Sequence, residues 1–89
     1  MRKIKLTRAN KSILLKALAP YYREKALGHS TQEVGKLILK INALPADKKA
    51  SFYAEEIFLM RSTINQLRND QLAKGQYTDA ADDMLLKLF

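Results

Sequence analysis

The stretch that decides the fold is YAEEIFLMRSTINQL, residues 53–67, the most apolar part of a long segment without helix breakers. Its large apolar side chains recur at alternating spacings of four and three residues, which is the seam pattern of packed helices. Between the breakers Pro45 and Gly75, this pattern predicts one helix over residues 46–74. The seam consists of Tyr53, Ile57, Met60, Ile64 and Leu67.

The run of apolar residues 57–60 cannot face a single core, because each residue turns the side-chain direction by about 100°. On a helical wheel Leu59 falls at the edge of a broad core face, together with Phe52. Phe58 falls on the other side, so it either lies beneath another segment or contacts a partner. We therefore predict a protein-contact surface on this side of the helix. It consists of Phe58, Arg61, Asn65 and Arg68.

Helix-start and helix-stop residues divide the rest of the chain. Thr7 and Ser30 are suitable N-caps, Ser30 forming a capping box with Glu33, and Pro20 either kinks the first helix or opens a second one. The expected elements are a basic lead over residues 1–6 and helices over 8–18, 20–27, 31–43, 46–74 and 79–88. The predicted fold is therefore all-α, a small compact bundle of four or five helices around one long third helix, in a single domain over residues 1–89.

The length of the predicted third helix suggests a second copy of the chain. A helix of about 28 residues is about 42 Å long, whereas a compact domain of this size has a diameter of about 30 Å. The helix must break near Ser62 and Thr63, project from the domain, or be a spine around which another molecule packs. We favour the spine, around which either a second copy of the chain, as in a dimer, or a different partner would pack.

Composition argues against catalysis and against cofactor or metal binding. The 89 residues include no cysteine and a single histidine, which excludes disulfides, thiolate sites and a classical zinc site. Glu55 and Glu56 are adjacent and diverge, so they do not form an acid–base pair. The aspartates at the start of the last helix are explained by its dipole. We therefore expect a protein that is not an enzyme, with no catalytic, cofactor-binding or metal-binding residues.

We do not expect a membrane-spanning segment in this sequence. Its longest apolar run is four residues, and Lys16 interrupts the apolar stretch of the N-terminal segment, so neither a spanning helix nor a cleaved signal peptide is predicted. The first helix is basic and amphipathic, but its apolar face is needed for the small core, so membrane association is not expected. The absence of cysteine agrees with a cytoplasmic location.

The net charge of +7 is concentrated in the first part of the chain, where residues 1–40 carry ten Lys or Arg and two Glu. Such asymmetry indicates an anionic partner or a solvated face. Contacts to phosphates would come from Arg2, Lys3, Lys5, Arg8 and Lys11.

Two stretches of the chain resemble DNA-binding motifs but do not match them fully. The stretch STQEVGKLI resembles the start of a helix-turn-helix, but the expected turn falls on Leu39, and Pro45 occupies a recognition-helix position. The stretch RKIKLT is compatible with an edge strand, as in ribbon-helix-helix proteins, although the long helical sequence after it does not favour that class. No family motif is specific enough to name.

The function that we expect is that of a small non-enzymatic protein that binds and modulates a protein partner. Its size and plain composition are typical of phage and plasmid regulators, inhibitors and adaptors. This is a general likeness and does not rest on a shared motif. The alternative is a nucleic-acid-binding regulator that uses the basic N-terminal half.

Overall fold

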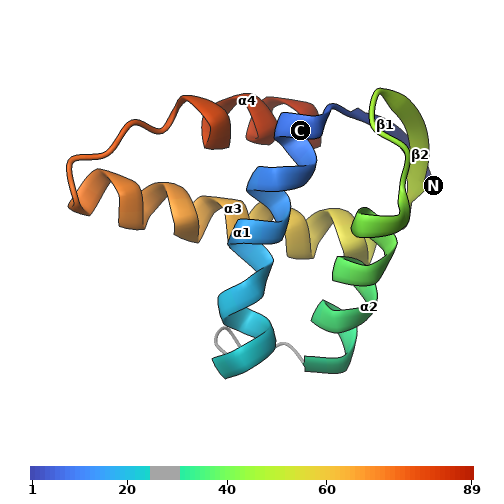
Figure 1. Cartoon of the computed structure of the whole chain (residues 1–89), viewed down its shortest axis with the longest axis horizontal. Helices are drawn as coiled ribbons and strands as arrows, with labels where there is room; N and C mark the ends of the chain where they lie inside the picture. Colours follow the sequence, from blue (N-terminus) through green and yellow to red (C-terminus); the bar gives the residue numbers. More distant parts are fainter. Residues whose placement is uncertain (25–30) are drawn as a thin grey trace.

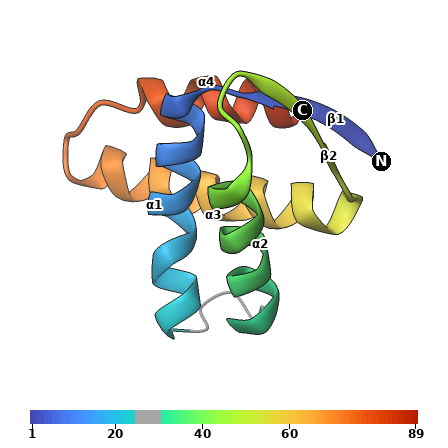
Figure 2. The ribbon, with the colours of Figure 1, turned by 45° about the vertical axis from the view of Figure 1, so that its right-hand side comes forward.

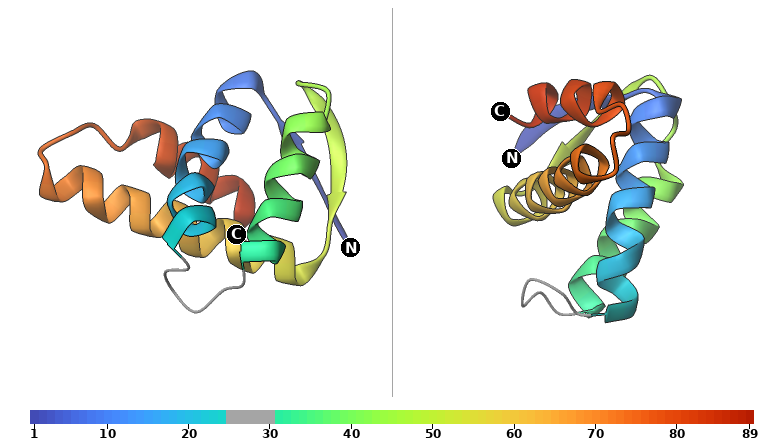
Figure 3. Two further views of the ribbon diagram at one scale, coloured as in Figure 1. Left: turned by 60° about the horizontal axis from the view of Figure 1, so that its bottom comes forward. Right: turned by 90° about the vertical axis from the view of Figure 1, so that its left-hand side faces the viewer.

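The computed structural model describes residues 1–24 and 31–89, which form four helices and a two-stranded sheet. In chain order they are β1 (Arg2–Leu6), α1 (Arg8–Glu24), α2 (Thr31–Ala43), β2 (Lys48–Phe52), α3 (Ala54–Ala73) and α4 (Asp79–Leu88). The pairs α1–α2 and α3–α4 are antiparallel, and the two pairs cross in two layers (Figures 1 and 3). The predicted helical bundle is confirmed in outline, with a small sheet added and with no fifth helix among the described residues.

The main correction concerns residues 48–52, which the sequence pattern placed in the long third helix. They form β2, which pairs antiparallel with β1, so residues 1–6 are a strand partner rather than a simple basic lead. Asp47 makes the turn into β2 with a φ of 66°, a left-handed conformation that Asp tolerates better than most residues. Its N–H donates to the carbonyl of Leu6 at 2.8 Å.

The strands form because their pairing buries apolar side chains that are far apart in the sequence. Ile4, Leu6 and Phe52 face the core and are 5%, 1% and 0% exposed. Burial of each such side chain stabilises the fold by about 1.5–3 kcal/mol. This gain requires both strands at once, so residues 48–52 alone do not determine their own conformation.

The helix α3 is shorter than predicted and does not project. It has 20 residues, which corresponds to about 30 Å, and the longest dimension of the molecule is 32 Å. It continues through Ser62 and Thr63, whose hydroxyls donate to the carbonyls of Phe58 and Leu59 at 2.9 and 3.0 Å. The length argument for a spine, and for a dimer built on it, therefore no longer applies.

The helix α1 runs through Pro20 without a break, so residues 20–24 belong to it instead of starting a separate helix. The predicted N-cap Thr7 is confirmed, since Thr7 and Asn10 each accept the other's N–H with a side-chain oxygen, at 3.1 and 3.0 Å. The remainder of the predicted helix 20–27 and the Ser30 cap lie outside the described residues.

Two helices have the bounds that their sequences predict. The helix α2 covers residues 31–43 and α4 covers 79–88. Gly75 ends the turn after α3 with a φ of 69°, and the N–H of Gln76 donates to the carbonyl of Gln71 at 2.8 Å. This is the Schellman arrangement that a glycine after a helix favours.

The core lies where α1 crosses α3 and extends beneath α4 and the sheet (Figure 2). Met60, Ile64 and Leu59 are buried as the wheel predicts, whereas Tyr53 is 55% exposed because it precedes the helix. The largest fully buried side chains are Phe52, Leu6, Leu14, Leu18, Ile41, Met60, Ile64, Met84, Leu88, Val34 and Thr63. In the described part of the chain, no helix combines the length and apolarity needed to cross a membrane.

Candidate functional site

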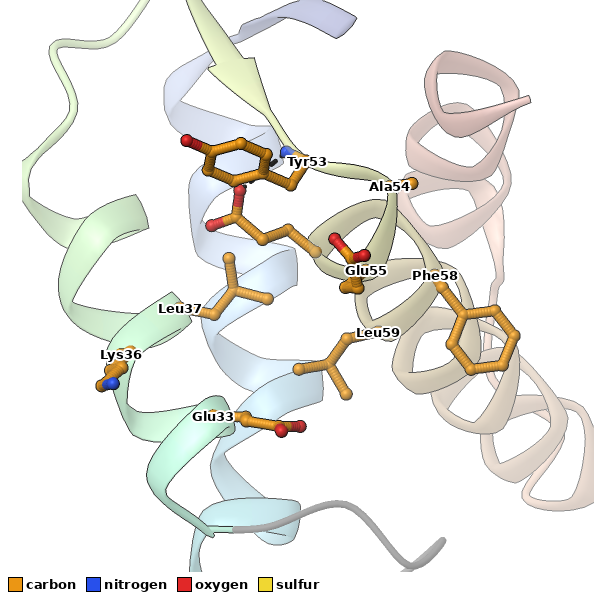
Figure 4. A pocket seen from close by; sticks show the side chains of 9 residues that line it. Glu33, Lys36, Leu37, Tyr53, Ala54, Glu55, Phe58 and Leu59 are labelled. Carbon is orange, nitrogen blue, oxygen red and sulfur yellow. Dashed lines mark hydrogen bonds between the residues drawn. The ribbon is translucent and has the colours of Figure 1, made fainter. Parts of the chain in front are cut away.

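A groove of about 660 Å³ opens between α2 and the start of α3 (Figure 4). It forms because α1 lies against both helices, while α2 and α3 diverge from each other below the end of β2 (Figure 1). The groove is lined by Glu33, Lys36 and Leu37 of α2, by Tyr53, and by Ala54, Glu55, Glu56, Phe58 and Leu59 of α3.

The floor of the groove is apolar and its walls carry exposed aromatic rings. Leu37 and Leu59 are 2% and 5% exposed and face each other between the helices (Figure 4). Phe58 is 61% exposed on the outer side of α3, and Tyr53 is 55% exposed at the upper end. The arrangement offers a recess for an apolar side chain with two aromatic contacts beside it.

The rim of the groove is acidic, although the chain has a net charge of +7. Among the described residues, the carboxylates of Glu33, Glu55 and Glu56 line it together with the ammonium of Lys36, and the Glu56 carboxylate is paired with Lys40. Glu33 points toward the space between the helices (Figure 4). The groove therefore has carboxylates from both α2 and α3 at its rim.

Lys40 fixes the wall of the groove by joining three elements. Its ammonium group donates to the carbonyl of Ser51 at 2.8 Å and to the carboxylate of Glu56 at 2.9 and 3.1 Å. The same carboxylate accepts the N–H of Tyr53 at 2.8 Å, which caps the start of α3. The ammonium also lies 4.6 Å from the ring centre of Phe52, within the range of a cation–π contact. Glu56 thus has a structural role at the edge of the groove.

Two of the four residues of the predicted protein-contact surface are engaged within the fold. Phe58 lines the groove and Asn65 is exposed. The guanidinium of Arg61 stacks 4.0 Å from the ring centre of Phe89, and that of Arg68 pairs with Asp82 of α4 at 2.5 Å. The two arginines therefore hold α4 against α3.

The Asp82 carboxylate is the acidic partner in this contact. The hydroxyl of Thr78 donates to it at 2.8 Å, and the guanidinium of Arg68 donates to its other oxygen. These two hydrogen bonds, the one from Thr78 first, lower the pKa of Asp82 below its usual value of 3.8 because they stabilise the charged form.

The predicted anion-contact residues also divide into two groups. Arg2 donates to the main-chain oxygens of Lys87, Leu88 and Phe89 at 2.6–2.8 Å, at the negative end of α4. Lys11 donates to the carbonyl of Leu44 at 2.5 Å, just after the end of α2. These two cations therefore neutralise the C-terminal ends of helices. The others, Lys3, Lys5 and Arg8, are exposed.

Most of the groove was not predicted from the sequence. Leu37 is not among the predicted site residues, and Tyr53 was assigned to the seam of a helix that in fact starts after it. Glu33 was considered only as part of a helix cap. The signal for the true start of α3 was the alternation of Ala50 and Phe52 with polar residues, which is typical of a strand with one buried face.

Within residues 1–24 and 31–89, no group of three or more His, Asp or Glu is arranged to hold a metal ion. Comparison of the chain with protein-family models, with curated proteins and with solved structures finds no match. The function is therefore inferred from the geometry of this molecule.

Proposed function

We propose that this protein is a non-enzymatic regulator that binds a protein partner in the groove between α2 and α3. The observation that carries the proposal is the combination of an apolar floor with exposed aromatic walls. Phe58, with 61% of its surface exposed, lines the groove from the outer side of α3, and the floor residues Leu37 and Leu59 are almost completely buried. Residues that dominate protein interfaces are typically large apolar or aromatic side chains next to such a recess.

The acidic rim defines the chemistry of the partner segment. Glu33 and Glu55 flank the recess, one on each helix. A segment with one large apolar side chain and with Lys or Arg on either side of it would satisfy both the floor and the rim. The cleft between two diverging helices suits an amphipathic helix, which presents apolar and basic side chains at fixed spacings.

Capture of such a segment would modulate the partner by occupying a surface that the partner uses elsewhere. This is how a small inhibitor or adaptor acts without catalysis, and it agrees with the size of the chain. A cytoplasmic location is part of the proposal, since a chain without cysteine is suited to a reducing compartment.

A displayed library of random peptides tests this proposal even though the natural partner is unidentified. Selection against the wild-type protein should enrich peptides with an apolar anchor between basic residues. These peptides should lose binding at least about tenfold to the Phe58→Asp variant, because an added carboxylate on the wall meets the apolar anchor.

Leu72→Asp provides the matched control, since Leu72 is also on α3 and is 53% exposed but does not line the groove. It should bind the selected peptides as the wild type does. Equal loss in both variants, or equal binding to both, would contradict the assignment of the groove. The same pair of variants then identifies the natural partner in a nuclease-treated host lysate.

A further inference from the structure

The sheet register gathers lysines from two distant parts of the sequence on one face. In the antiparallel pairing, Lys5 lies opposite Lys49 and Lys3 lies opposite Ser51. Directly opposed residues point to the same side of a sheet, and Ile4 between the lysines points into the core. We call the set Lys3, Lys5, Lys49 and Ser51 the outer ribbon face. All three lysines are exposed.

One end of this face carries additional positive charge. Arg8 begins α1 directly after β1 and is exposed, whereas Lys48 is paired with the buried Leu6 and therefore lies on the other side of the ribbon. Asp47 at the turn is the nearby acidic residue in the sequence. The outer ribbon face and its end therefore carry the exposed cations Lys3, Lys5, Lys49 and Arg8, at the edge of the molecule (Figure 2).

The placement of these cations works against the stability of the free protein. Lys5 and Lys49 are directly opposed, and like charges in that position destabilise a sheet. Arg8 lies in the first turn of α1, where the helix dipole disfavours a positive charge. Both costs fall if an anion lies against the ribbon.

From these observations we propose that the outer ribbon face binds the phosphate backbone of double-stranded DNA. A two-stranded ribbon, with strands about 4.8 Å apart, fits the major groove of B-form DNA, which is about 12 Å wide. Lysine and serine present no bidentate fork for reading a base, so the ribbon contacts phosphates and binds without strong sequence preference. This site is separate from the groove between α2 and α3 and shares no lining residue with it.

The test is the salt dependence of binding to a labelled B-form duplex of mixed sequence, measured by fluorescence anisotropy. Each phosphate contact contributes about 0.9 to the slope of log affinity against log salt. The Lys5→Gln/Lys49→Gln double variant should therefore lower the slope by about 1.8 and the affinity at low salt by at least about tenfold.

The matched control is Lys16→Gln/Lys74→Gln, which has the same net charge but removes two exposed lysines outside the ribbon. It should keep the slope of the wild type within about 0.5. Equal slopes for the two double variants would overturn the proposal, as would the absence of duplex binding by the wild type. Stronger binding to a single strand or to vesicles of anionic lipid than to the duplex would also overturn it.

Lys49→Glu separates binding from folding. It places a carboxylate opposite Lys5, which should raise the midpoint of thermal unfolding while it weakens duplex binding. A loss of binding with a gain in stability cannot result from unfolding. The proposal fails if Lys49→Glu binds the duplex as well as the wild type does. Peptides bound in the groove should be unaffected by this variant, so the two proposed sites can fail independently.

Discussion

The groove and the outer ribbon face are two surfaces of opposite character on the same small molecule. The groove has an apolar floor with Glu33 and Glu55 on its rim, whereas the ribbon presents Lys3, Lys5 and Lys49 on a polar face. They meet at the end of β2, where Phe52 is buried and Lys40 bridges to Ser51 and Glu56. The net charge of +7 therefore describes neither surface, because the fold places carboxylates at the groove and lysines on the ribbon.

The contrast between the two surfaces also shows that a basic residue in the sequence is not automatically available to a ligand. Arg2, Lys11 and Lys40 all belong to the basic N-terminal half, yet each is engaged with carbonyls or a carboxylate of the fold. Lys49 lies in the other half, which is acidic overall, and yet it joins the ribbon. Position in the fold decides which cations face solvent.

The largest effect should come from a buried residue that supports both surfaces and lines neither. Phe52→Ala removes a completely buried ring at the end of β2 and should lower the free energy of unfolding by about 3–5 kcal/mol. Because the ring supports the sheet and the start of α3 together, duplex binding and peptide binding should both weaken. Urea denaturation followed by circular dichroism measures the loss in stability.

Phe58→Ala is the control for this prediction, since it removes the same ring from an exposed position. It should change the free energy of unfolding by at most about 0.5 kcal/mol while weakening peptide binding in the groove. Similar stability losses for the two variants would show that Phe58 is covered in solution.

A smaller loss of stability, with weaker binding at only one of the two surfaces, should come from the bridge that Lys40 makes. Lys40→Met removes the bridge from α2 to Ser51 and Glu56 and should cost roughly 1 kcal/mol, because the ion pair is partly exposed. Peptide binding in the groove should weaken, whereas the salt slope of duplex binding should stay that of the wild type.

A double-mutant cycle of Lys40→Met with Glu56→Gln measures the coupling between the two side chains. We expect the second substitution to cost less once the first is present. Additive losses would mean that Lys40 stabilises the contact of α2 with β2 and α3 mainly through Phe52 and the carbonyl of Ser51.

The smallest effect should come from the α3–α4 contact, which lies outside both surfaces. The pKa of Asp82 is lowered by Thr78 and by Arg68, so the ionised carboxylate stabilises the folded state. This contribution is complete above the unfolded value of 3.8 and is lost as the pH falls through the lower folded value. Carboxyl titration by NMR should show the pKa of Asp82 rising in Thr78→Val and in Arg68→Met.

Both of those variants should leave peptide binding and duplex binding at neutral pH unchanged. A change in either would mean that α4 takes part in one of the two surfaces. An Asp82 pKa at or above 3.8 in the wild type would contradict the hydrogen bonds that the carboxylate accepts.

Local sequence was sufficient for the elements that carry their own boundary signals. Residues 31–43 and 79–88 are helices with one apolar face and with a breaker or a charged first turn at the ends. Gly75 ended α3 where a left-handed residue was required, and Thr7 capped α1. Each of these features depends on neighbours within about one helical turn.

Residues 48–52 could not be assigned in this way. Their sequence has no helix breaker, and their strand conformation depends on hydrogen bonds to residues 2–6, more than forty positions away. The start of α3, and with it the exposure of Tyr53, follows from that pairing. The groove was missed for the same reason, since its two walls come from helices that only the fold brings together.

Periodicity and composition alone established that this protein is mainly helical, that Leu59, Met60 and Ile64 of α3 are buried, and that positive charge is concentrated in the N-terminal half. These properties depend on short distances along the chain. The three-dimensional arrangement was needed to show that Lys49 joins Lys5, that Arg2 and Lys11 are engaged at helix ends, and that Phe58 lies beside an apolar recess. The physical reason is that strand pairing and helix crossing place distant residues side by side, and their energies depend on partners that no local window contains.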